Sequence, residues 1–415
     1  MERLISLFGL FFMIGIAWTM SSHRKRIPWR IVGGGLALQF VFALIVLKTD
    51  PGQAAFAWMG DFFKMILGFV DEGAAFMFDI HPRPSDAPMP PSPTLWRTFA
   101  FGVLPTVIFF SALMSVLYHV GVMQKIVQFF AWIMQKSLGT SGAESLSAAA
   151  NIFVGQTEAP LVIRPYVNEM TLSELNAVMV GGFATIAGGV LAAYVAMGVD
   201  PGHLITASVI SAPAALLIAK VMQPETEHSK TLGTVELKIE KTNANLVEAA
   251  ASGASDGMKL ALNIAAMLVA FVALVAMCNA GVAWLGGLFG FEGAGSWTLQ
   301  RAFGVVFSPL AWLMGISWAE AGLAGEIIGT KTVLNEFVAF ADLATRKAEF
   351  SERSFTILTY ALAGFANFSS IGIQLGGIGG IAPGRKSDLA RLGLRAMIGG
   401  TLAAFMTACV AGLLI

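Results

Sequence analysis

Charged residues are scarce in this sequence. Asp, Glu, Lys and Arg make up only 13% of the 415 residues, whereas 56% are hydrophobic, and the mean hydropathy is +0.72. A soluble domain has no reason to carry so much apolar surface. The 26 basic and 26 acidic residues cancel, so nothing indicates a surface for nucleic acid or a polybasic lipid anchor. The composition therefore predicts a polytopic membrane protein.

Cysteine and histidine are also rare. The two cysteines, Cys278 and Cys409, each lie in an apolar run, which favours single buried thiols over a disulfide. The five histidines are scattered without the spacing of metal ligands. The chain shows no Ser/His/Asp constellation, metal cluster or phosphate-binding loop. The sequence therefore predicts neither an enzyme nor a bound cofactor.

One stretch, N-I-F-V-G-Q-T-E-A-P from Asn151 to Pro160, does not fit an ordinary membrane helix. It places polar side chains and a carboxylate between apolar runs that are too short to span a bilayer, which takes about 20 apolar residues. A glycine loosens its backbone and a proline lacks an N–H, so the helix should break near Gln156, Thr157 and Glu158. Broken backbone at membrane depth is tolerated inside protein or beside a watery cavity. The stretch predicts a re-entrant hairpin whose polar tip holds a solute.

The remaining chain is typical of a series of membrane helices. Apolar runs predict spans over 4–20, 31–47, 99–120, 178–195, 203–222, 260–288 and 394–414. Charges recur between apolar residues over 52–78, which suits a helix in the membrane interface. Further helices are expected over 125–136 and 299–314. Loops are expected over the proline-rich 82–93 and the polar 223–245, and residues 246–259 either lie in the interface or extend the following span.

Basic residues gather in short loops at two places. One cluster lies between the first two spans, and the other precedes the last span and contains Arg385, Lys386, Arg391 and Arg395. Because Lys and Arg favour cytoplasmic loops, both clusters should be cytoplasmic, which leaves both chain ends outside. The first apolar run has its basic cluster after it, so we expect a retained span and not a signal peptide.

The second half of the chain repeats the first in outline. A second interrupted apolar segment, 321–340, carries G-T-K-T-V-L-N-E-F at its middle. The sequence Gly364-Phe-Ala-Asn367 also matches Gly182-Phe-Ala-Thr185 of the first half. Such a pair of interrupted segments predicts an internal repeat with a binding site near the membrane midplane. Glycines recur every fourth residue after the second motif, and we expect Gly372, Gly376 and Gly380 to form a ridge for helix packing.

Carboxylates at the two breaks are the first candidates for binding. A charged residue at the centre of a membrane helix costs about 2.5 to 3.5 kcal/mol on insertion scales, so Glu158 and Glu336 indicate a solute or ion site. The alternative is a buried ion pair with Lys331 or Arg164. Uncharged groups that can orient a neutral solute bearing hydroxyl and amide groups are Gln156, Thr157 and Asn367. Each of these, taken alone, can instead bond a freed backbone group.

Other residues near the breaks are weaker candidates. Only a serine that faces the cavity can touch a solute, which applies to Ser370 and its neighbour. Phe365 can wall a ring-bearing ligand. Backbone carbonyls freed around Asn151 and Val154, with the Thr185 hydroxyl opposite, offer the oxygen ligands that a hard cation such as sodium takes in transporters with broken helices.

Three long motifs closely resemble those of the concentrative nucleoside transporter family in its bacterial form: N-I-F-V-G-Q-T-E-A-P-L-V-I-R-P-Y, G-T-K-T-V-L-N-E-F-V-A and G-F-A-N-F-S-S-I-G-I-Q-L-G-G. The resemblance covers nearly the whole chain. It implies an all-α protein of eight transmembrane helices, an interfacial helix, and two re-entrant hairpins in an inverted-repeat transport core. It also implies a homotrimer in the bacterial inner membrane, in which a substrate-carrying domain moves like an elevator past a trimeric scaffold.

The resemblance also divides the chain into functional parts. Residues 1–120 would be mainly scaffold, 121–222 the first transport repeat with its hairpin, 223–298 a loop and a long scaffold helix, and 299–415 the second repeat and the last helix. Carried over by motif, the nucleobase would meet Gln156, Thr157 and Glu158, with Val190 beside it. The ribose would meet Glu336, Asn367 and Ser370, with Phe365 by the sugar or base. Sodium would take the backbone carbonyls of Asn151, Val154, Thr185 and Ile186 and the Thr185 hydroxyl.

The function expected from this resemblance is sodium-coupled import of nucleosides such as uridine. One alternative is a proton-coupled transporter in which Glu158 or Glu336 titrates. The other is an intramembrane enzyme that uses the same two carboxyl groups as an acid and a base. The sequence leaves open the preference for purine or pyrimidine nucleosides, because that preference depends on the shape of the pocket.

Overall fold

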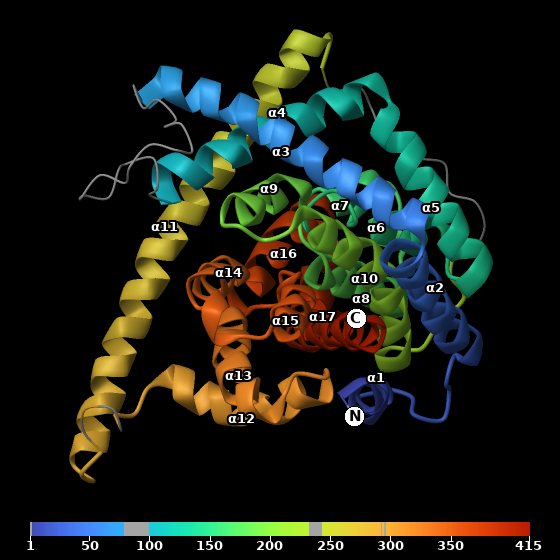
Figure 1. Ribbon diagram of the computed structural model, residues 1–415. Helices are drawn as coiled ribbons and strands as arrows, with labels where there is room; N and C mark the ends of the chain where they lie inside the picture. The colour runs from blue at the N-terminus through green and yellow to red at the C-terminus, as the bar shows by residue number, and fades with distance from the viewer. Residues whose placement is uncertain (1, 79–98, 232–242, 292, 294–295) are drawn as a thin grey trace.

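The computed structural model describes residues 2–78, 99–231, 243–291, 293 and 296–415, and these residues are mostly helical (Figure 1). Within them, six helical stretches are long and apolar enough to cross a membrane: Glu2–Thr19, Trp29–Lys48, Leu172–Ala196, Pro201–Met222, Leu246–Gly287 and Pro383–Leu414. A pair of helices bent by 80°, Leu104–Val120 and Val122–Leu138, would add a seventh. The prediction of an all-helical, polytopic membrane protein is confirmed.

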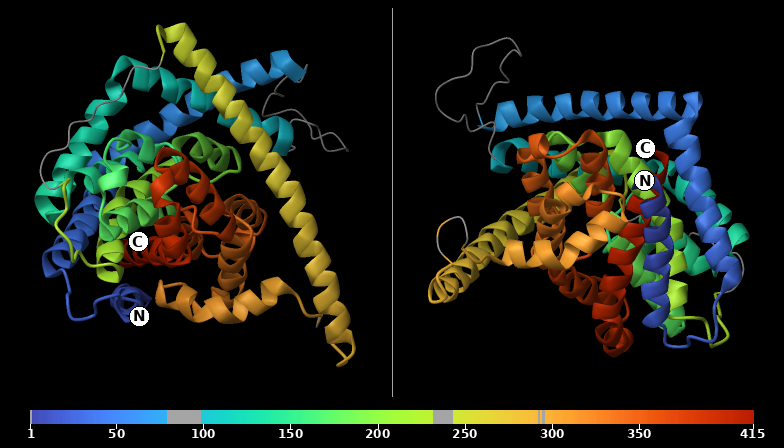
Figure 2. Two further views of the ribbon diagram at one scale, coloured as in Figure 1. Left: turned by 180° about the vertical axis from the view of Figure 1, so that it is seen from behind. Right: turned by 60° about the horizontal axis from the view of Figure 1, so that its bottom comes forward.

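The first half begins with helices that lie at the outside of the molecule: α1 (Glu2–Thr19), α2 (Trp29–Lys48), α3 (Asp50–Phe78), α4 (Leu104–Val120) and α5 (Val122–Leu138). Helix α3 runs across the direction of α1 and α2 (Figure 2). This is the orientation that a helix in the membrane interface would have relative to spanning helices. The loop predicted over 82–93 lies outside the described residues.

Helix α11 (Leu246–Gly287) lies along the outer edge and packs against α4 (Figures 1 and 2). It is one helix of 42 residues, so 246–259 extend the predicted span. Only 6% of its most apolar stretch is buried. After α11, the chain returns toward the core through α12 (Leu299–Leu313), which packs against α13 (Trp318–Val333). Both cysteines are free thiols, but Cys278 on this helix is exposed and only Cys409 is buried. The prediction of a buried thiol at 278 was wrong because the apolar surface of α11 faces outward.

The centre of the molecule is the last helix, α17 (Lys386–Leu414). It packs against α1 and against four helices of the core: α8 (Leu172–Ala184), α10 (Pro201–Met222), α15 (Glu352–Leu362) and α16 (Phe368–Ile381). At one end Arg3 donates to the Ile415 carbonyl, and at the other Arg395 donates to the Met20 carbonyl. The two termini therefore lie together, and the two basic clusters lie together at the opposite end, as the sequence predicted.

Both predicted breaks are present. Helix α6 (Gly142–Ala150) ends at the first motif, and the next helical residues form the short α7 (Ala159–Val162). The second motif lies partly in helix α13 (Trp318–Val333) and partly in helix α14 (Glu336–Thr345), with a break at Leu334 and Asn335 between them. Asn335 caps α14 by accepting a hydrogen bond from the Val338 amide. Gln156, Thr157 and Glu158 therefore lie in a non-helical tip, and Asn335 and Glu336 lie at the start of a new helix. The polar residues 330–332 remain in the last turn of α13.

The helices that follow the two breaks are interrupted as well. The two interrupted segments pass across each other in contact. Helix α8 stops at Ala184, and α9 (Gly188–Ala196) continues the chain; α15 and α16 are separated by 363–367. The Phe365 amide donates to the Thr185 carbonyl across the crossing, at 3.3 Å. A Cβ on Gly364 would lie 2.8 Å from the Phe183 carbonyl oxygen, so only glycine allows this approach. The two matched motifs thus meet at the centre of the fold.

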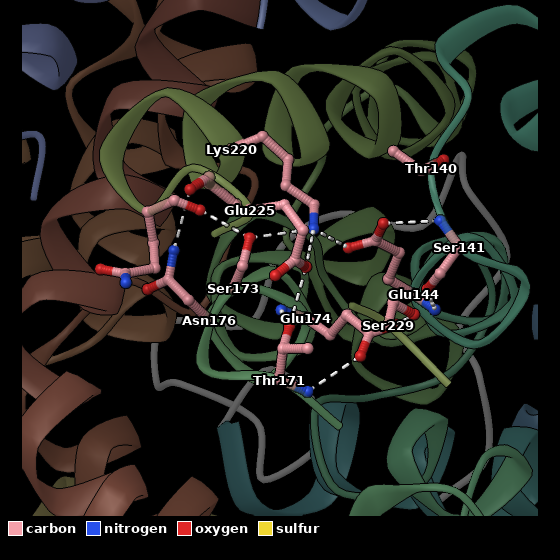
Figure 3. A network of polar contacts seen from close by, with 12 residues as sticks. Thr140, Ser141, Glu144, Thr171, Ser173, Glu174, Asn176, Lys220, Glu225 and Ser229 are labelled. Carbon is pink, nitrogen blue, oxygen red and sulfur yellow. Dashed lines mark hydrogen bonds and ion pairs between the residues drawn. The ribbon is translucent and has the colours of Figure 1, made fainter. Parts of the chain in front are cut away.

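A buried polar network holds the helices of the first break in place (Figure 3). Ser141 and Glu144 form a capping box at the start of α6, and Thr171 and Glu174 form another at the start of α8. The Lys220 ammonium, from the end of α10, lies 2.7 Å from the Glu144 carboxylate, and both side chains are at most 4% exposed. The network therefore joins α6, α8 and α10 through charged groups that are nearly buried.

The predicted surface loop after α10 takes part in this network. Within its described residues, the Ser229 hydroxyl donates to Glu174 at 2.6 Å, and the Gln223 carbonyl accepts a hydrogen bond from Ser173. Ser229 and Thr231 are only 3% and 5% exposed. The prediction of a surface loop holds for much of 223–231, since 226–228 and Lys230 are exposed. It is wrong for Ser229 and Thr231, because their hydroxyl groups satisfy the buried Glu174 carboxylate.

The expected glycine ridge of α16 is not where this helix packs. A Cβ on Gly372, Gly376 or Gly380 would meet nothing within 4 Å. A Cβ on Gly377 would instead lie 2.9 Å from the Thr157 methyl group, at the tip of the first break. The close approach of α16 is thus one residue away from the predicted ridge, and it holds the helix against the first tip.

Candidate functional site

A cavity of about 120 Å³ lies between the two breaks and α11. The eight residues predicted to contact the solute all line it: Gln156, Thr157, Glu158, Val190, Glu336, Phe365, Asn367 and Ser370. They come from separate segments of the chain that the crossing of the interrupted helices brings together. The cavity is mostly apolar with a few convergent polar groups, which is the usual character of a small-molecule site.

Glu336 is the most strongly held of these side chains. It is 3% exposed and lies in the first turn of α14, where the helix dipole favours negative charge. The Tyr194 hydroxyl donates to one carboxylate oxygen at 3.2 Å, and the Asn367 amide donates to the other at 2.9 Å. A carboxylate oxygen has two lone pairs, so each can accept a further hydrogen bond. Glu336 can therefore accept from hydroxyl groups that enter the cavity.

The ion-pair alternative is not what the structure shows. The Lys331 ammonium is buried, but it donates to the Ala361 carbonyl at 2.9 Å, in the last turn of α15. Among the described residues, no basic side chain lies within 4.0 Å of the Glu158 or Glu336 carboxylate. Arg164 is exposed. Both carboxylates are thus available to the cavity.

Asn367 has a defined orientation because it is the N-cap of α16. Its side-chain oxygen accepts from the Ser370 amide at 2.9 Å and from the Ser369 hydroxyl at 2.7 Å. The oxygen is therefore committed to the helix end, and the nitrogen faces Glu336. The oxygen of the Asn367 amide thus caps α16, while its nitrogen holds the Glu336 carboxylate in the cavity.

The residues at the tip of the first break differ in how far they are buried. Gln156 is 6% exposed and donates to the Ser370 hydroxyl at 3.1 Å, whereas Glu158 is exposed. A Cβ on Gly155 would lie 2.5 Å from a Glu158 carboxylate oxygen, so the glycine leaves room for that side chain. The tip therefore offers one fixed amide and one free carboxylate.

The structure adds residues that the sequence did not single out. Leu260 and Ile264 of α11 line the cavity, and nothing distinguishes them from other apolar residues of a long span. Tyr194 holds Glu336, and Gln374 donates to Gln156 at 3.1 Å. A sequence signal existed for Gln374, because it follows Ser370 by one helical turn and a glutamine in an apolar helix needs a hydrogen-bonding partner.

The two segments that carry the residues predicted to bind sodium are joined by a hydrogen bond. The Phe153 carbonyl accepts from the Gly188 amide at 3.0 Å, which joins the first tip to the break between α8 and α9. Within the described residues, no backbone amide donates to the carbonyls of Asn151, Val154 and Ile186. The Asn151 side-chain oxygen is also buried and has no hydrogen-bond partner. Unpaired oxygens suit a hard cation, so this donor set fits sodium.

Thr185 contributes to the same place. Its hydroxyl is 1% exposed and donates to the Gly181 carbonyl at 3.0 Å, so its lone pairs stay free. Its own carbonyl accepts the long hydrogen bond from Phe365. The hydroxyl oxygen thus remains available to a cation, while the carbonyl is shared with the second motif.

A larger cavity, of about 250 Å³, lies at the basic end of the molecule and is lined by Arg26, Glu144 and Lys220 among others. Glu144 and Lys220 pair with each other, and neither break contributes to this cavity. The smaller cavity is the better candidate because both breaks converge on it.

Family models match most of the chain. Residues 8–80 match "Na+ dependent nucleoside transporter N-terminus", 100–200 match "Nucleoside recognition", and 203–412 match "Na+ dependent nucleoside transporter C-terminus". An uncharacterized transporter of Haemophilus influenzae is 48% identical over 421 residues, covering 100% of this chain and 98% of that protein. Sodium/nucleoside cotransporter 1 of Mus musculus is 43% identical over 429 residues, and the match covers 100% of this chain but only 64% of that relative.

Solved structures agree with these matches. The structure of CNTnw in an inward-facing, substrate-bound state has a TM-score of 0.90 at 42% identity, covering 100% of this chain and 98% of that chain. A variant of CNTnw in an outward-facing state has the same TM-score and identity. Solute carrier family 28 member 3 of Eptatretus stoutii is 45% identical, and the match covers 61% of its length. The chain therefore spans less than two thirds of several animal relatives and nearly all of the bacterial one.

Proposed function

We propose, from the premise that this chain belongs to the concentrative nucleoside transporter family, that it is a sodium-coupled symporter importing nucleosides such as uridine. The family is one of sodium-dependent nucleoside transporters, and the chain is not an enzyme. The hypothesis of an intramembrane acid–base enzyme is therefore dropped. The observation that carries the proposal is that Glu336 and the polar tip of the first break line one cavity.

The groups around the cavity suit the two parts of a nucleoside. Adjacent ribose hydroxyls can donate to Glu336, and such charge-assisted hydrogen bonds are roughly twice as strong as neutral ones. Asn367 and Ser370 offer further donors and acceptors beside it, and Phe365 provides an apolar wall. Gln156, Thr157 and Glu158 would face the nucleobase, with Val190 packing against it. A free base would leave the ribose-binding groups unpaired, which favours the nucleoside.

Sodium would bind at the crossing of the first tip with the break after α8. Its ligands would be the carbonyls of Asn151, Val154, Thr185 and Ile186 and the Thr185 hydroxyl. Binding there would order the tip that carries Gln156, Thr157 and Glu158. Sodium would then raise the affinity for the nucleoside, and the nucleoside would raise the affinity for sodium by the same factor.

The proposal extends to the whole molecule. The chain would have eight transmembrane helices, an interfacial helix α3, and two re-entrant hairpins in inverted repeats at 121–222 and 299–415. Residues 1–120 and 223–298 would provide most of the scaffold of a homotrimer in the bacterial inner membrane. The transport repeats would slide past this scaffold like an elevator. The nearly unburied α11 supports a scaffold role, because its exposed face needs lipid or another protomer to cover it.

Uptake into proteoliposomes tests the coupling ion. Radiolabelled uridine, adenosine and free uracil are offered to the purified protein with an inward sodium gradient, or with choline in its place at the same pH. We expect uridine uptake that falls at least about tenfold without sodium, and no uptake of uracil. Uridine uptake that persists in choline and follows a proton gradient would assign the protein to proton coupling.

Glu336→Gln tests the ribose site. The substitution keeps the shape of the side chain but removes the charge, so the hydrogen bonds to the ribose lose strength. We expect the KM for uridine to rise at least about tenfold, in line with the roughly 1.5 to 3 kcal/mol of a hydrogen bond to a charged group. Exposed Glu169→Gln is the control and should transport as the unmodified protein does. An unchanged KM in the first variant would refute the assigned role.

A further inference from the structure

A line of hydrogen bonds runs behind the first tip. Gln374 of α16 is fully buried, and its side-chain nitrogen donates to the Met179 carbonyl and to the Gln156 side-chain oxygen, both at 3.1 Å. The Gln156 nitrogen in turn donates to the Ser370 hydroxyl at 3.1 Å. Gln156 lines the cavity, whereas Gln374 does not. Gln374 therefore contacts the site only through another side chain.

The Met179 backbone carbonyl sets the donor and acceptor order of these hydrogen bonds, because a carbonyl can only accept. It therefore requires the nitrogen of Gln374 on its side. The same nitrogen then requires the oxygen of Gln156 to face it. The remaining nitrogen of Gln156 must face Ser370. An isolated glutamine amide can turn over and exchange its donor and acceptor, but this one is held in one sense.

The bond to the Met179 carbonyl ties α16 to α8, but it uses only one of the polar groups of Gln374. Its side-chain oxygen is buried and has no hydrogen-bond partner, which is a cost that an apolar residue would avoid. A Cβ on Gly182 would lie 2.8 Å from the Gln374 nitrogen and 2.9 Å from the Gln156 Cβ, so α8 closes directly over the pair. Both amides are thus packed where they cannot exchange partners with solvent.

We propose that Gln374 is a positioning residue that fixes the Gln156 amide in one direction and thereby sets which nucleobases the cavity accepts. The inference rests on the proposed function, since it assumes that Gln156 faces the base. A uracil ring presents an acceptor oxygen where a cytosine ring presents a donor amino group. An amide held in one direction matches only one of these edges, whereas an amide free to turn matches both.

The test compares uridine with cytidine in the sodium-driven uptake assay. The unmodified protein should show different KM values for the two nucleosides. Gln374→Met keeps the length of the side chain and removes both of its donors. We expect the ratio of the two KM values to move toward one by about fivefold, the change that a neutral hydrogen bond of about 1 kcal/mol produces, while kcat for the preferred nucleoside stays within about twofold.

A double-mutant cycle separates positioning from general packing. In a Gln156→Ala background, Gln374→Met should leave the ratio of KM values unchanged, because the amide through which it acts is gone. Gly376→Ala, on the same helix and next to open space, is the control and should alter neither KM. An equal shift in both backgrounds, an unaltered ratio in the single variant, or no base preference in the unmodified protein would overturn the proposal.

Failure of this inference can be told from failure of the proposed function. An unmodified protein without sodium-driven uptake contradicts the function, whereas normal uptake with an unaltered ratio contradicts only the role of Gln374. Gln374→Leu serves as a second variant if the methionine variant is not inserted in the membrane. Loss of folded protein in both variants would make Gln374 a structural residue and would also overturn the proposal.

Discussion

Tyr194 shows how a residue outside the motifs can shape the site. It is fully buried on α9, where its ring packs 4.4 Å from that of Phe340 and 4.9 Å from that of Phe337. This packing leaves its hydroxyl one direction, toward Glu336. The aromatic contacts place the donor, and the donor then orients the carboxylate. The Tyr194 ring thus packs in the apolar core, while its hydroxyl orients a polar group of the cavity.

Tyr194→Phe should therefore weaken nucleoside binding without unfolding the protein. The variant keeps the ring and loses one hydrogen bond to a carboxylate. That bond forms without the solute, so the KM for uridine should rise by less than the roughly tenfold or more that its full value of about 1.5 to 3 kcal/mol would give. Tyr360→Phe is the matched control, because that hydroxyl is bonded to His203, outside the cavity lining. Equal effects of the two substitutions on KM, measured by uptake at matched protein levels, would argue against a role for Tyr194 in orienting Glu336.

At the scale of the elements, the first break depends on anchors that lie away from its tip. Helix α6 has only 9 residues, which is too short for stability by itself in water. Its start is held by its capping box, by the Lys220–Glu144 pair, and by a hydrogen bond from the Gly142 amide to the Thr231 carbonyl. The chain can therefore leave helical geometry at the tip, because the start of α6 is held in place.

Lys220→Met should destabilise the protein strongly. Removing one partner of a buried ion pair leaves the Glu144 charge uncompensated, which costs about 3 to 5 kcal/mol. We expect a clearly lower Tm of the purified protein in detergent. Adding Glu144→Gln should restore part of the loss, since glutamine can still complete the capping box without a charge.

The exposed pair of Lys230 with Glu169 gives a control for this experiment. Its atoms are 3.6 Å apart and its side chains are 69% and 60% exposed, so the pair contributes about 0 to 1 kcal/mol. Lys230→Met should leave the Tm nearly unchanged. A similar fall in Tm for both lysine variants would mean that burial of the network does not decide its contribution.

At the scale of the whole molecule, the cavity lies where parts of different mobility would meet. One wall is α11, at the outer edge, and the others belong to the core around α17. In the elevator movement proposed above, such a cavity would open to one side of the membrane or the other as the transport repeats move.

Linkage between sodium and nucleoside gives a prediction for the intact protein. If both order the same tip, uridine should raise the Tm more in sodium than in choline. A ligand at 100 times its Kd stabilises the folded state by about 2.7 kcal/mol, and coupling of about 1 to 3 kcal/mol should be largely lost when sodium is replaced. Thermal unfolding of the purified protein measures both effects. Equal Tm shifts in the two salts would contradict coupling through the tip.

The sequence by itself determined the features that depend on local chemistry. Pro160, Gly155 and the polar residues between them make helix geometry unfavourable wherever the chain folds, so the first break was predictable. The capping box at Thr171 was predictable for the same reason. Seven of the eight predicted residues that line the cavity were candidates because they are charged, polar or aromatic residues at or beside the two breaks. The family resemblance added Val190 and divided the others between base and ribose.

Only the tertiary structure decided which distant groups meet. The crossing of the segments at Thr185 and Gly364, the burial of Ser229, the donation from Gln374 to Gln156, and the exposure of Cys278 all depend on which helices pack together. Apolar residues look alike along a membrane helix whether they face lipid or protein, because both environments are dry. Sequence therefore indicates where a polar group needs a partner, and the packing of the helices decides which partner it finds.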